Sequence, residues 1–251
     1  MIKQTVRRMV RAFGYDLRQR RPELVEFLKD REINLVLDVG ANTGQFGATL
    51  RAEGYSGTII SFEPASVPFS ELRHRATGDR RWVPLKLSLG DRPGRVKLNV
   101  SRYNTFSSVL RQTSNASAFE KNSAVDHVEE VEMACLDDVC EIKPNDRVFL
   151  KVDTQGFEEQ VLNGARITLN SALGVLLEVP VVHMYEQVWS FEQALRFMDS
   201  VGFVLAQIKP VNFLWRQDPV SVSELDCVFR RKIESIDNLR LTDPISQSAS
   251  P

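Results

Sequence analysis

Acidic side chains stand where the apolar runs of this sequence end. Asp38 lies near the end of the first long run, and Glu63 directly follows the second. Two later runs lead to Asp153 and to Glu178. A carboxylate in such a place can accept hydrogen bonds from hydroxyl groups, pair with an ammonium group or take up a proton. These four acids are therefore the first candidates for binding and for chemistry.

The turn that follows Asp38 carries two glycines, Gly40 and Gly44, which let the backbone turn tightly and approach a ligand. It is not a dinucleotide fingerprint, because Asn42 stands at the place of the second glycine, and no Gly-Lys-Ser/Thr follows as in a P-loop. A ligand with an ammonium and a carboxylate suits this turn better than a pyrophosphate, so an NAD-linked oxidoreductase is the weaker hypothesis. Asp38 can pair with such an ammonium directly or through water. The alternative is a plain turn whose glycines serve packing.

Two further turns offer contacts for a nucleoside. Glu63 follows the glycine turn by about 20 residues, the spacing at which a ribose-binding carboxylate occurs in nucleotide-binding folds. The turn that begins at Ser88 and Leu89 can present its backbone to an adenine edge, with Leu89 against the ring. Each has an alternative. Glu63 can be a surface acid that caps the next helix, and the segment at Ser88 can be an ordinary turn.

The elements that must position these residues alternate between strands and helices. The apolar pattern predicts strands at 33–39, 58–62, 82–87, 147–152, 174–179, 203–208 and 225–231. Helices are predicted at 3–13, 22–29, 46–52, 66–75, 157–163 and 191–200. The region between the third and fourth strands adds two alternating stretches, 95–100 and 128–135, and a polar segment at 103–122 that we expect to be irregular. This order indicates an α/β fold with a doubly wound sheet, in which ligands bind beyond the carboxyl ends of the strands.

Length and composition agree with one large globular domain. The chain has 251 residues, of which 43% are hydrophobic and 26% charged, with a net charge of −1. No apolar run approaches the roughly 20 residues that cross a bilayer. The three cysteines lack the spacing of a metal site or a disulfide framework and fit a reducing cytoplasm. We expect a basic helical segment at 1–30, the main domain at 31–233 and a flexible tail at 234–251.

The first 21 residues carry seven basic side chains and one acid. A basic amphipathic segment of this kind is typical of peripheral contact with an anionic membrane surface, and the alternative is a solvated helix face. Elsewhere no basic patch is interleaved with aromatic residues, so nucleic-acid binding is not expected. We therefore expect a cytoplasmic protein that contacts the cytoplasmic face of a membrane.

Taken together, the motifs resemble the FkbM family of S-adenosylmethionine-dependent methyltransferases. The matching segments are Asp38 to Phe46 (DVGANTGQF), Phe62-Glu63-Pro64, Ser88 to Asp91, Val131 to Asp138, and Lys151 to Ala165. The resemblance covers roughly residues 33–205. It implies a class I methyltransferase fold, a Rossmann-like sheet of seven strands that is mostly parallel with the last strand antiparallel.

The resemblance also assigns residues to the cofactor. It implies that S-adenosylmethionine is bound by Asp38, Gly40, Ala41, Asn42, Gly44, Phe46, Glu63, Pro64, Ser88, Leu89 and Asp153. In that arrangement the glycine turn holds the methionine end, Glu63 holds the ribose, and Asp153 faces the amino group or the reaction centre. Members of the family resemble O-methyltransferases that act on hydroxyls of sugars, glycolipids and polyketides.

Methyl transfer to a hydroxyl needs a group that receives the proton of the alcohol, or a metal ion. The candidate catalytic residues are Asp153, Glu178 and His183. Asp153 and Glu178 are also compatible with Mg²⁺, which nothing in the spacing requires. For His183 the alternative is a hydrogen-bonded loop residue.

Recognition of the acceptor is expected in the 103–122 segment and around Met184, Tyr185 and Trp189. Phe106 and Phe119 would anchor a mobile lid, whereas Tyr185 and Trp189 have core packing as their alternative. We expect a sugar-containing small molecule or a glycolipid as the acceptor. The alternatives are an acceptor from secondary metabolism, such as a polyketide, and a non-catalytic nucleoside-binding module.

Overall fold

The computed structural model describes residues 24–102, 106–119, 124–214 and 221–233. The helix expected at 3–13, most of the basic segment and the expected tail at 234–251 lie outside these residues. Within them, no helix combines the length and the apolar character that crossing a bilayer requires.

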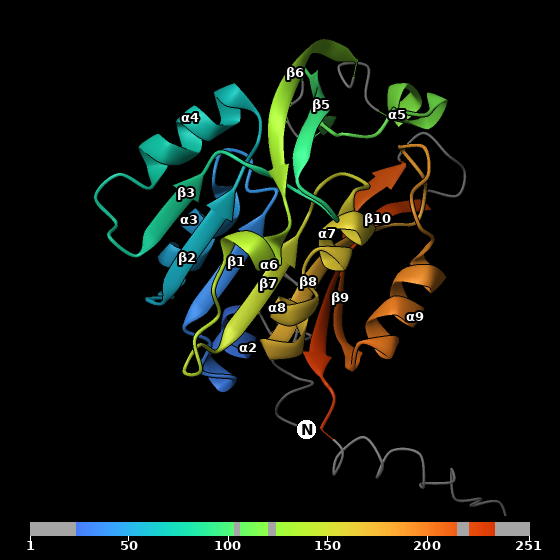
Figure 1. Cartoon of the computed structure of the whole chain (residues 1–251). Coiled ribbons are helices and arrows are strands. Elements are labelled where there is room, and N and C mark those ends of the chain that lie inside the picture. Colours follow the sequence, from blue (N-terminus) through green and yellow to red (C-terminus); the bar gives the residue numbers. More distant parts are fainter. Residues whose placement is uncertain (1–23, 103–105, 120–123, 215–220, 234–251) are drawn as a thin grey trace, which may run out of the picture.

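A seven-stranded sheet forms the centre of the molecule (Figure 1). In spatial order its strands are β3 (Trp82–Leu85), β2 (Thr58–Phe62), β1 (Leu35–Val39), β7 (Val148–Val152), β8 (Ala172–Pro180), β10 (Ser221–Arg231) and β9 (Phe203–Leu214). The strands from β3 to β8 pair in parallel, whereas β10 is antiparallel to both β8 and β9. This confirms the mostly parallel, doubly wound sheet with an antiparallel last strand. The chain order reverses direction at β1, and the motif residues follow β1, β2 and β7.

Helices cover both faces of the central sheet (Figure 1). Helices α2 (Leu24–Asp30), α3 (Gln45–Ala52) and α4 (Ser66–Arg75) contribute to one hydrophobic cluster. Helices α6 (Leu136–Val139), α7 (Glu158–Asn163), α8 (Arg166–Ser171) and α9 (Phe191–Ser200) contribute to the other. Strand residues alternate between the two, because successive side chains of a strand point to opposite faces. Val36 and Phe149 join the first cluster, and Leu37 and Leu150 join the second.

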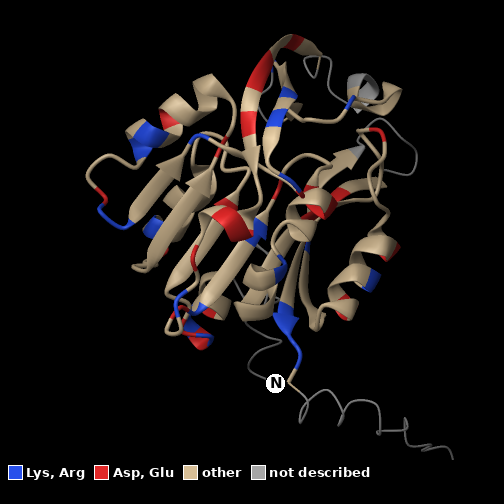
Figure 2. Ribbon diagram, in the orientation of Figure 1, with Lys and Arg blue, Asp and Glu red and all other residues tan. Residues whose placement is uncertain are grey.

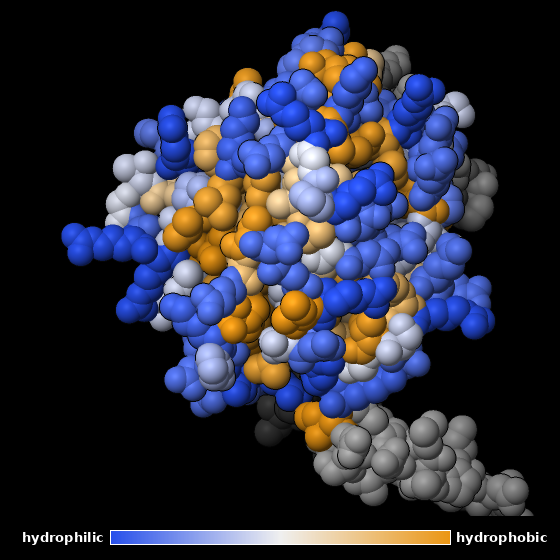
Figure 3. All heavy atoms as spheres, viewed as in Figure 1, coloured by the Kyte–Doolittle hydropathy of each residue, from blue (hydrophilic) through white to orange (hydrophobic). Residues whose placement is uncertain are grey.

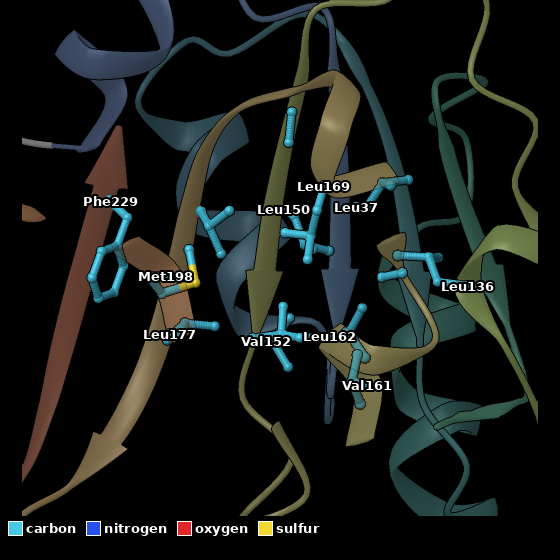
Figure 4. Packing of buried hydrophobic residues seen from close by; sticks show 14 of the residues in the cluster. Leu37, Leu136, Leu150, Val152, Val161, Leu162, Leu169, Leu177, Met198 and Phe229 are labelled. Carbon is cyan, nitrogen blue, oxygen red and sulfur yellow. The ribbon is translucent and has the colours of Figure 1, made fainter. Parts of the chain in front are cut away.

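The second cluster contains the largest part of the core (Figure 4). Three leucines from neighbouring strands lie against side chains from α7, α8 and α9: Leu37, Leu150 and Leu177 against Leu162, Leu169 and Met198. All of them are almost fully buried. Since both faces of β1 and β7 are covered, their apolar runs are continuous, as expected for central parallel strands.

The inserted region forms a second sheet of its own. Its strands are β4 (Ser88–Leu89), β6 (Val125–Ala134) and β5 (Gly94–Ser101), in that spatial order. Charged side chains lie along β5 and β6, including an exposed pair in which Arg95 Nη1 lies 3.6 Å from Glu130 Oε2 (Figure 2). The sequence predicted the two longer strands but not that they form a separate sheet. The alternation of apolar and polar residues indicates a strand, but it does not indicate which strand pairs with it.

Two expectations about the elements were wrong in part. The 103–122 segment, expected to be irregular, contains the short helix α5 (Ser114–Phe119). Its Ser, Asn and Thr content favours turns, and a single helical turn with little apolar surface leaves no periodic pattern. The last two strands are also longer than predicted, since β9 reaches Leu214 and β10 begins at Ser221.

Figure 3 shows that one face of the molecule mixes hydrophobic and hydrophilic side chains in small groups.

Candidate functional site

A cavity of about 380 Å³ lies at the carboxyl ends of the parallel strands. Its volume is in the range of small-molecule sites. It is lined by Val39, Gly40, Asn42, Phe62, Glu63, Pro64, Leu87, Ser88, Leu89, Leu98, Phe106, Ser107, Val109, Asp153, Thr154, Gln155, Phe157, Glu178, Asn212 and Glu224. The lining thus comes from the ends of β1, β2, β7 and β8 and from β9 and β10 of the central sheet. The second sheet supplies Ser88 and Leu89 from β4 and Leu98 from β5.

The structure brings most of the sequence-predicted residues together at this cavity. Those in the lining are Gly40, Asn42, Glu63, Pro64, Ser88, Leu89, Asp153 and Glu178. Those outside the lining are Asp38, Ala41, Gly44, Phe46 and His183. For this second group, direct contact with a ligand stays a prediction.

Glu63 lies at the wall of the cavity with its carboxylate held by the backbone. Its Oε2 accepts a hydrogen bond of 2.8 Å from Asn42 N, and its Oε1 accepts one of 2.8 Å from Ala65 N. Each carboxylate oxygen retains a second lone pair, so both can still accept from a ligand. Burial raises the pKa of Glu63 to about 7, although the two backbone donors act in the opposite direction. The carboxylate is therefore oriented before any ligand arrives.

Asp38 lies beneath the cavity, in a lateral row across the sheet. It is in register with Ser61 on β2 and with Lys151 on β7, so the three side chains share one face. Asp38 Oδ2 accepts a hydrogen bond of 2.9 Å from Ser61 Oγ, and Asp38 Oδ1 lies 3.2 Å from Lys151 Nζ. The carboxylate is fully buried. The ammonium beside Asp38 in this structure is that of Lys151.

Lys151 ties the glycine turn to the end of β7. Its Nζ donates to Gly40 O at 2.7 Å and to Val39 O at 3.2 Å, and it lies 3.5 Å from Asp153 Oδ2. Burial alone would lower the pKa of Lys151, but the carboxylates of Asp38 and Asp153 raise it above its ordinary value. Lys151 therefore stays charged, and its hydrogen bonds to the backbone oxygens of Val39 and Gly40 hold the glycine turn in place.

We predict that Lys151→Met destabilises the protein by about 3–5 kcal/mol, because it leaves the buried Asp38 carboxylate without its counter-ion. Urea unfolding at pH 7 would measure the loss. The double variant Lys151→Met with Asp38→Asn is expected to recover a large part of it, since the fully buried side chain at position 38 is then neutral and the Asp153 carboxylate is partly exposed to water. Equal stability of the single and double variants would contradict the ion-pair account.

The two glycines of the turn serve different purposes. Gly40 has φ +74°, and a Cβ there would lie 1.7 Å from Asp153 O, so the turn passes directly against the end of β7. Gly44 has φ +85°, and its Cβ would lie 2.8 Å from Leu72 Cδ1 on α4. Gly40 therefore permits the close approach to β7 at the cavity. Gly44 packs against α4, in agreement with the packing alternative, and its contact with a ligand stays a prediction.

The turn after β7 is organised around Glu158, a residue that the sequence analysis did not single out. Glu158 is buried, and its Oε1 accepts hydrogen bonds from Thr154 N at 2.8 Å, Thr154 Oγ1 at 3.1 Å and Gly156 N at 3.1 Å. Burial raises its pKa to about 7. The sequence contained one signal that could have identified this residue: it is an acid at the start of a helix, two residues after a glycine. Glu158 shapes the loop that carries Asp153 and Gln155.

A second group of carboxylates closes the far wall of the cavity. Glu178 on β8 and Glu224 on β10 both line it, and Glu224 Oε2 accepts from Asn212 Nδ2. Burial, with the charges of Asp153 and Glu224, raises the pKa of Glu178 well above its usual range. Burial likewise raises the pKa of Asp226, the cross-strand partner of Glu178, to about 6. The sequence analysis missed Glu224 and Asn212. The available signal was that each is a polar residue in a largely apolar strand.

His183 does not join these acids. Its side chain is exposed, and its carbonyl oxygen accepts hydrogen bonds of 3.0 Å from Thr113 Oγ1 and from Asn115 Nδ2. Tyr185 and Trp189 are buried in hydrophobic clusters, as the core alternative held. The hydroxyl of Tyr185 nevertheless reaches the turn after β7, where it contacts Gln155.

The segment expected to recognise an acceptor reaches the cavity in part. Phe106, Ser107 and Val109 are in the lining, and Phe106 is buried there. The side chain of Phe119 lies outside the described residues. In the part of the chain that the structure describes, no three His, Cys, Asp or Glu side chains are grouped so that they could hold a metal ion.

Comparisons with solved structures show distant similarity. Magnesium protoporphyrin IX methyltransferase from Synechocystis, solved with bound SAM, is 10% identical with a TM-score of 0.46, over 83% of this chain and 76% of that one. A TehB-like SAM-dependent methyltransferase from Corynebacterium glutamicum is 14% identical with a TM-score of 0.40, over 92% and 96%. The 1,6-didemethyltoxoflavin-N1-methyltransferase of Burkholderia thailandensis is 9% identical with a TM-score of 0.45, over 83% and 76%. No curated protein matches the sequence.

The family comparison is specific. The model of the methyltransferase FkbM domain matches residues 38–205, from the first motif acid through the beginning of β9. That range contains every cavity-lining residue except Asn212 and Glu224. Because the match covers more than half of the sequence, this chain belongs to the FkbM methyltransferase family.

Proposed function

We propose that this chain transfers a methyl group from S-adenosylmethionine to a hydroxyl of a sugar, carried by a glycolipid or a glycan. Methyl transfer itself follows from membership in the FkbM methyltransferase family, whose fold is that of the class I enzymes that use this cofactor. The hydroxyl and the sugar are the proposal, and the chemistry of the cavity supports them.

The charge of the cavity is the observation that carries the proposal. Its described lining contains four acidic side chains, Glu63, Asp153, Glu178 and Glu224, and no lysine, arginine or histidine. A pyrophosphate would meet these acids without a cation beside it, which argues against a dinucleotide. A nucleoside that carries a sulfonium and an ammonium group would instead be attracted. The cavity therefore suits a positively charged methyl donor.

The residues present fit that donor. The buried Glu63 carboxylate retains lone pairs for the two hydroxyls of a ribose, and Gly40 lines the cavity in a turn that lies directly against the end of β7. Ser88 and Leu89 would offer backbone and an apolar side chain to the adenine. When bound, the cofactor supplies a methyl group that is already electrophilic.

The protein must then orient an alcohol and receive its proton. Of the two acids expected here we assign the base to Asp153, because burial and the neighbouring carboxylates raise the pKa of Glu178 and so favour its protonated form. The alcohol oxygen would form its bond to the methyl carbon as the bond from that carbon to the sulfonium sulfur breaks, which leaves neutral S-adenosylhomocysteine, and Asp153 would accept the hydroxyl proton. Positioning of the alcohol can supply about 7–11 kcal/mol of the barrier in favourable cases.

Phe106, Ser107 and Asn212 would face the acceptor, since an aromatic ring stacks on a sugar and the polar side chains bind its hydroxyls. Incubation with S-adenosylmethionine labelled in the methyl group and a panel of sugars, glycolipids and polyketides, followed by mass spectrometry, tests the proposal. Label on a sugar oxygen is the expected result. Label only on a polyketide, on nitrogen or carbon, or on nothing would overturn the proposed acceptor.

The basic residues at 1–21 support a further part of the proposal, contact with the cytoplasmic face of a membrane. Sedimentation with anionic vesicles is expected to depend on salt and to be lost when residues 1–21 are removed. Equal sedimentation of the full chain with neutral and anionic vesicles would contradict it.

We predict that the affinity for S-adenosylhomocysteine rises about tenfold between pH 6 and pH 8. Glu63 has a pKa of about 7, and its ionised form accepts the two ribose hydroxyls best. Calorimetry across this range measures the change. Glu63→Gln is expected to bind more weakly and with little pH dependence. A pH dependence that persists unchanged in this variant would remove Glu63 as its source.

A further inference from the structure

We propose that Gln155 is a positioning residue, which holds the carboxylates of Asp153 and Glu178 together at the cavity wall so that Asp153 points at the acceptor hydroxyl. This inference rests on the proposed function of the cavity. It assigns a role to a side chain that neither binds the proton nor carries charge.

One amide group joins the two acids. Gln155 Nε2 donates a hydrogen bond of 3.0 Å to Asp153 Oδ1 and one of 2.6 Å to Glu178 Oε2. An amide nitrogen has two N–H groups, so each acid receives one. Lys151 lies beside the other oxygen of Asp153, Oδ2, but without a donor between the two acids only repulsion or a shared proton would act between Asp153 Oδ1 and Glu178.

The hydroxyl of Tyr185 fixes the orientation of the Gln155 amide. The Tyr185 hydroxyl donates to Gln155 Oε1 at 3.1 Å, and Tyr185 itself is buried. If the amide were turned over, its oxygen would face two carboxyl oxygens and its nitrogen would face the hydroxyl. The observed arrangement satisfies all three partners, and Tyr185 therefore selects the side on which the two N–H groups lie.

The backbone is strained in a way that serves this side chain. Gln155 has φ +56°, a left-handed conformation that is unfavourable for a residue with a Cβ. Its carbonyl accepts a hydrogen bond of 2.7 Å from Ser108 Oγ, which anchors the turn to the segment that reaches the cavity. Glycine would relieve the strain, but it would have no amide to place between the acids.

The charges that act on the Glu178 carboxyl come from several elements. They are Asp153, Lys151 on β7, Glu158 on α7, and Glu224 and Asp226 on β10, and Lys209 on β9 acts in turn on Asp226. Acids predominate in this group, and they raise the pKa of Glu178 further than burial alone does. A neutral donor can join two acids here without adding a charge of its own.

Gln155→Met tests the proposal, because it keeps the length of the side chain and removes both N–H groups. Carboxyl ¹³C NMR, with Glu178→Gln to assign the signal, follows the titration of Glu178. We expect its midpoint to rise by about one to two pH units, since the ionised form loses a hydrogen bond. With any acceptor from the panel, we expect kcat to fall at least tenfold while calorimetry shows unchanged binding of S-adenosylhomocysteine.

Two further variants separate positioning from folding. Tyr185→Phe removes only the hydroxyl that orients the amide and is expected to give a smaller shift of the same sign. Gln187→Met makes the same substitution at an exposed residue that also has a left-handed backbone, φ +59°, and is expected to change neither readout.

The outcomes distinguish the two proposals. An unchanged Glu178 midpoint and unchanged kcat in Gln155→Met would overturn the role of Gln155, even if the chain methylates sugars. A shifted midpoint in a protein that methylates none of the acceptors would support the placement of the two acids by Gln155 and would count against the proposed function.

Discussion

Asp153→Asn is expected to lower the rate of methyl transfer by about 10²- to 10⁴-fold, the usual contribution of a general base. Asparagine has nearly the shape of aspartate but does not accept a proton from an alcohol. The variant also loses the charge that lies 3.5 Å from Lys151 Nζ, while Lys151 keeps Asp38 as its partner. Single-turnover kinetics with labelled cofactor would measure the rate.

The matched control is Glu178→Gln, which is expected to have a much smaller effect, because burial and the neighbouring acids raise the pKa of Glu178 and favour its protonated form, which does not act as a base. The sequence analysis left a second role for Asp153, contact with the amino group of the cofactor. That role predicts a raised KM for S-adenosylmethionine with kcat preserved. A full rate at saturating cofactor in Asp153→Asn would therefore decide against the base and in favour of binding.

Gly40→Ala is expected to destabilise the protein by more than about 4 kcal/mol. Few kinds of single substitution cause so large a loss of stability. The added Cβ would lie 1.7 Å from the backbone oxygen of Asp153, and this atom belongs to the end of β7 and does not rotate away. Relief of the clash requires the glycine turn and β7 to move apart. Urea unfolding would measure the loss, and the cavity between the two strand ends would be distorted with it.

Gly54→Ala separates this clash from backbone strain. Gly54 has φ +89°, similar to the +74° of Gly40, but a Cβ there would meet nothing within 4 Å. Its expected cost is only the left-handed conformation, about 1–2 kcal/mol. If the two alanine variants lost the same stability, the close approach of the turn to β7 would not be the reason for glycine at position 40.

The central elements could be predicted because their signals are local. A continuous apolar run marks a buried strand wherever it occurs, and β2 and α4 have the predicted bounds, 58–62 and 66–75. Acids at strand ends could likewise be read as neighbours, since parallel strands bring their carboxyl ends to one edge. Glu63, Asp153 and Glu178 do line one cavity.

The partners of the buried polar groups could not be predicted in the same way. The sequence placed Asp38 toward a ligand, whereas the register of β1 with β7 sets it beside Lys151, 113 positions away in the chain. The burial of both side chains comes from the helices of that face. A one-residue change of register would turn either side chain to the other face.

The sequence by itself determined the alternation of strands and helices, the glycine turn and the acids that follow the strands, because each depends on residues close together in the chain. Only the tertiary structure decided that β10 lies between β8 and β9, that the inserted strands form their own sheet, and that Gln155 joins Asp153 to Glu178. Strand order and side-chain partners depend on packing between distant segments. Local periodicity reports whether a residue is buried, and it carries no information about which residue lies against it.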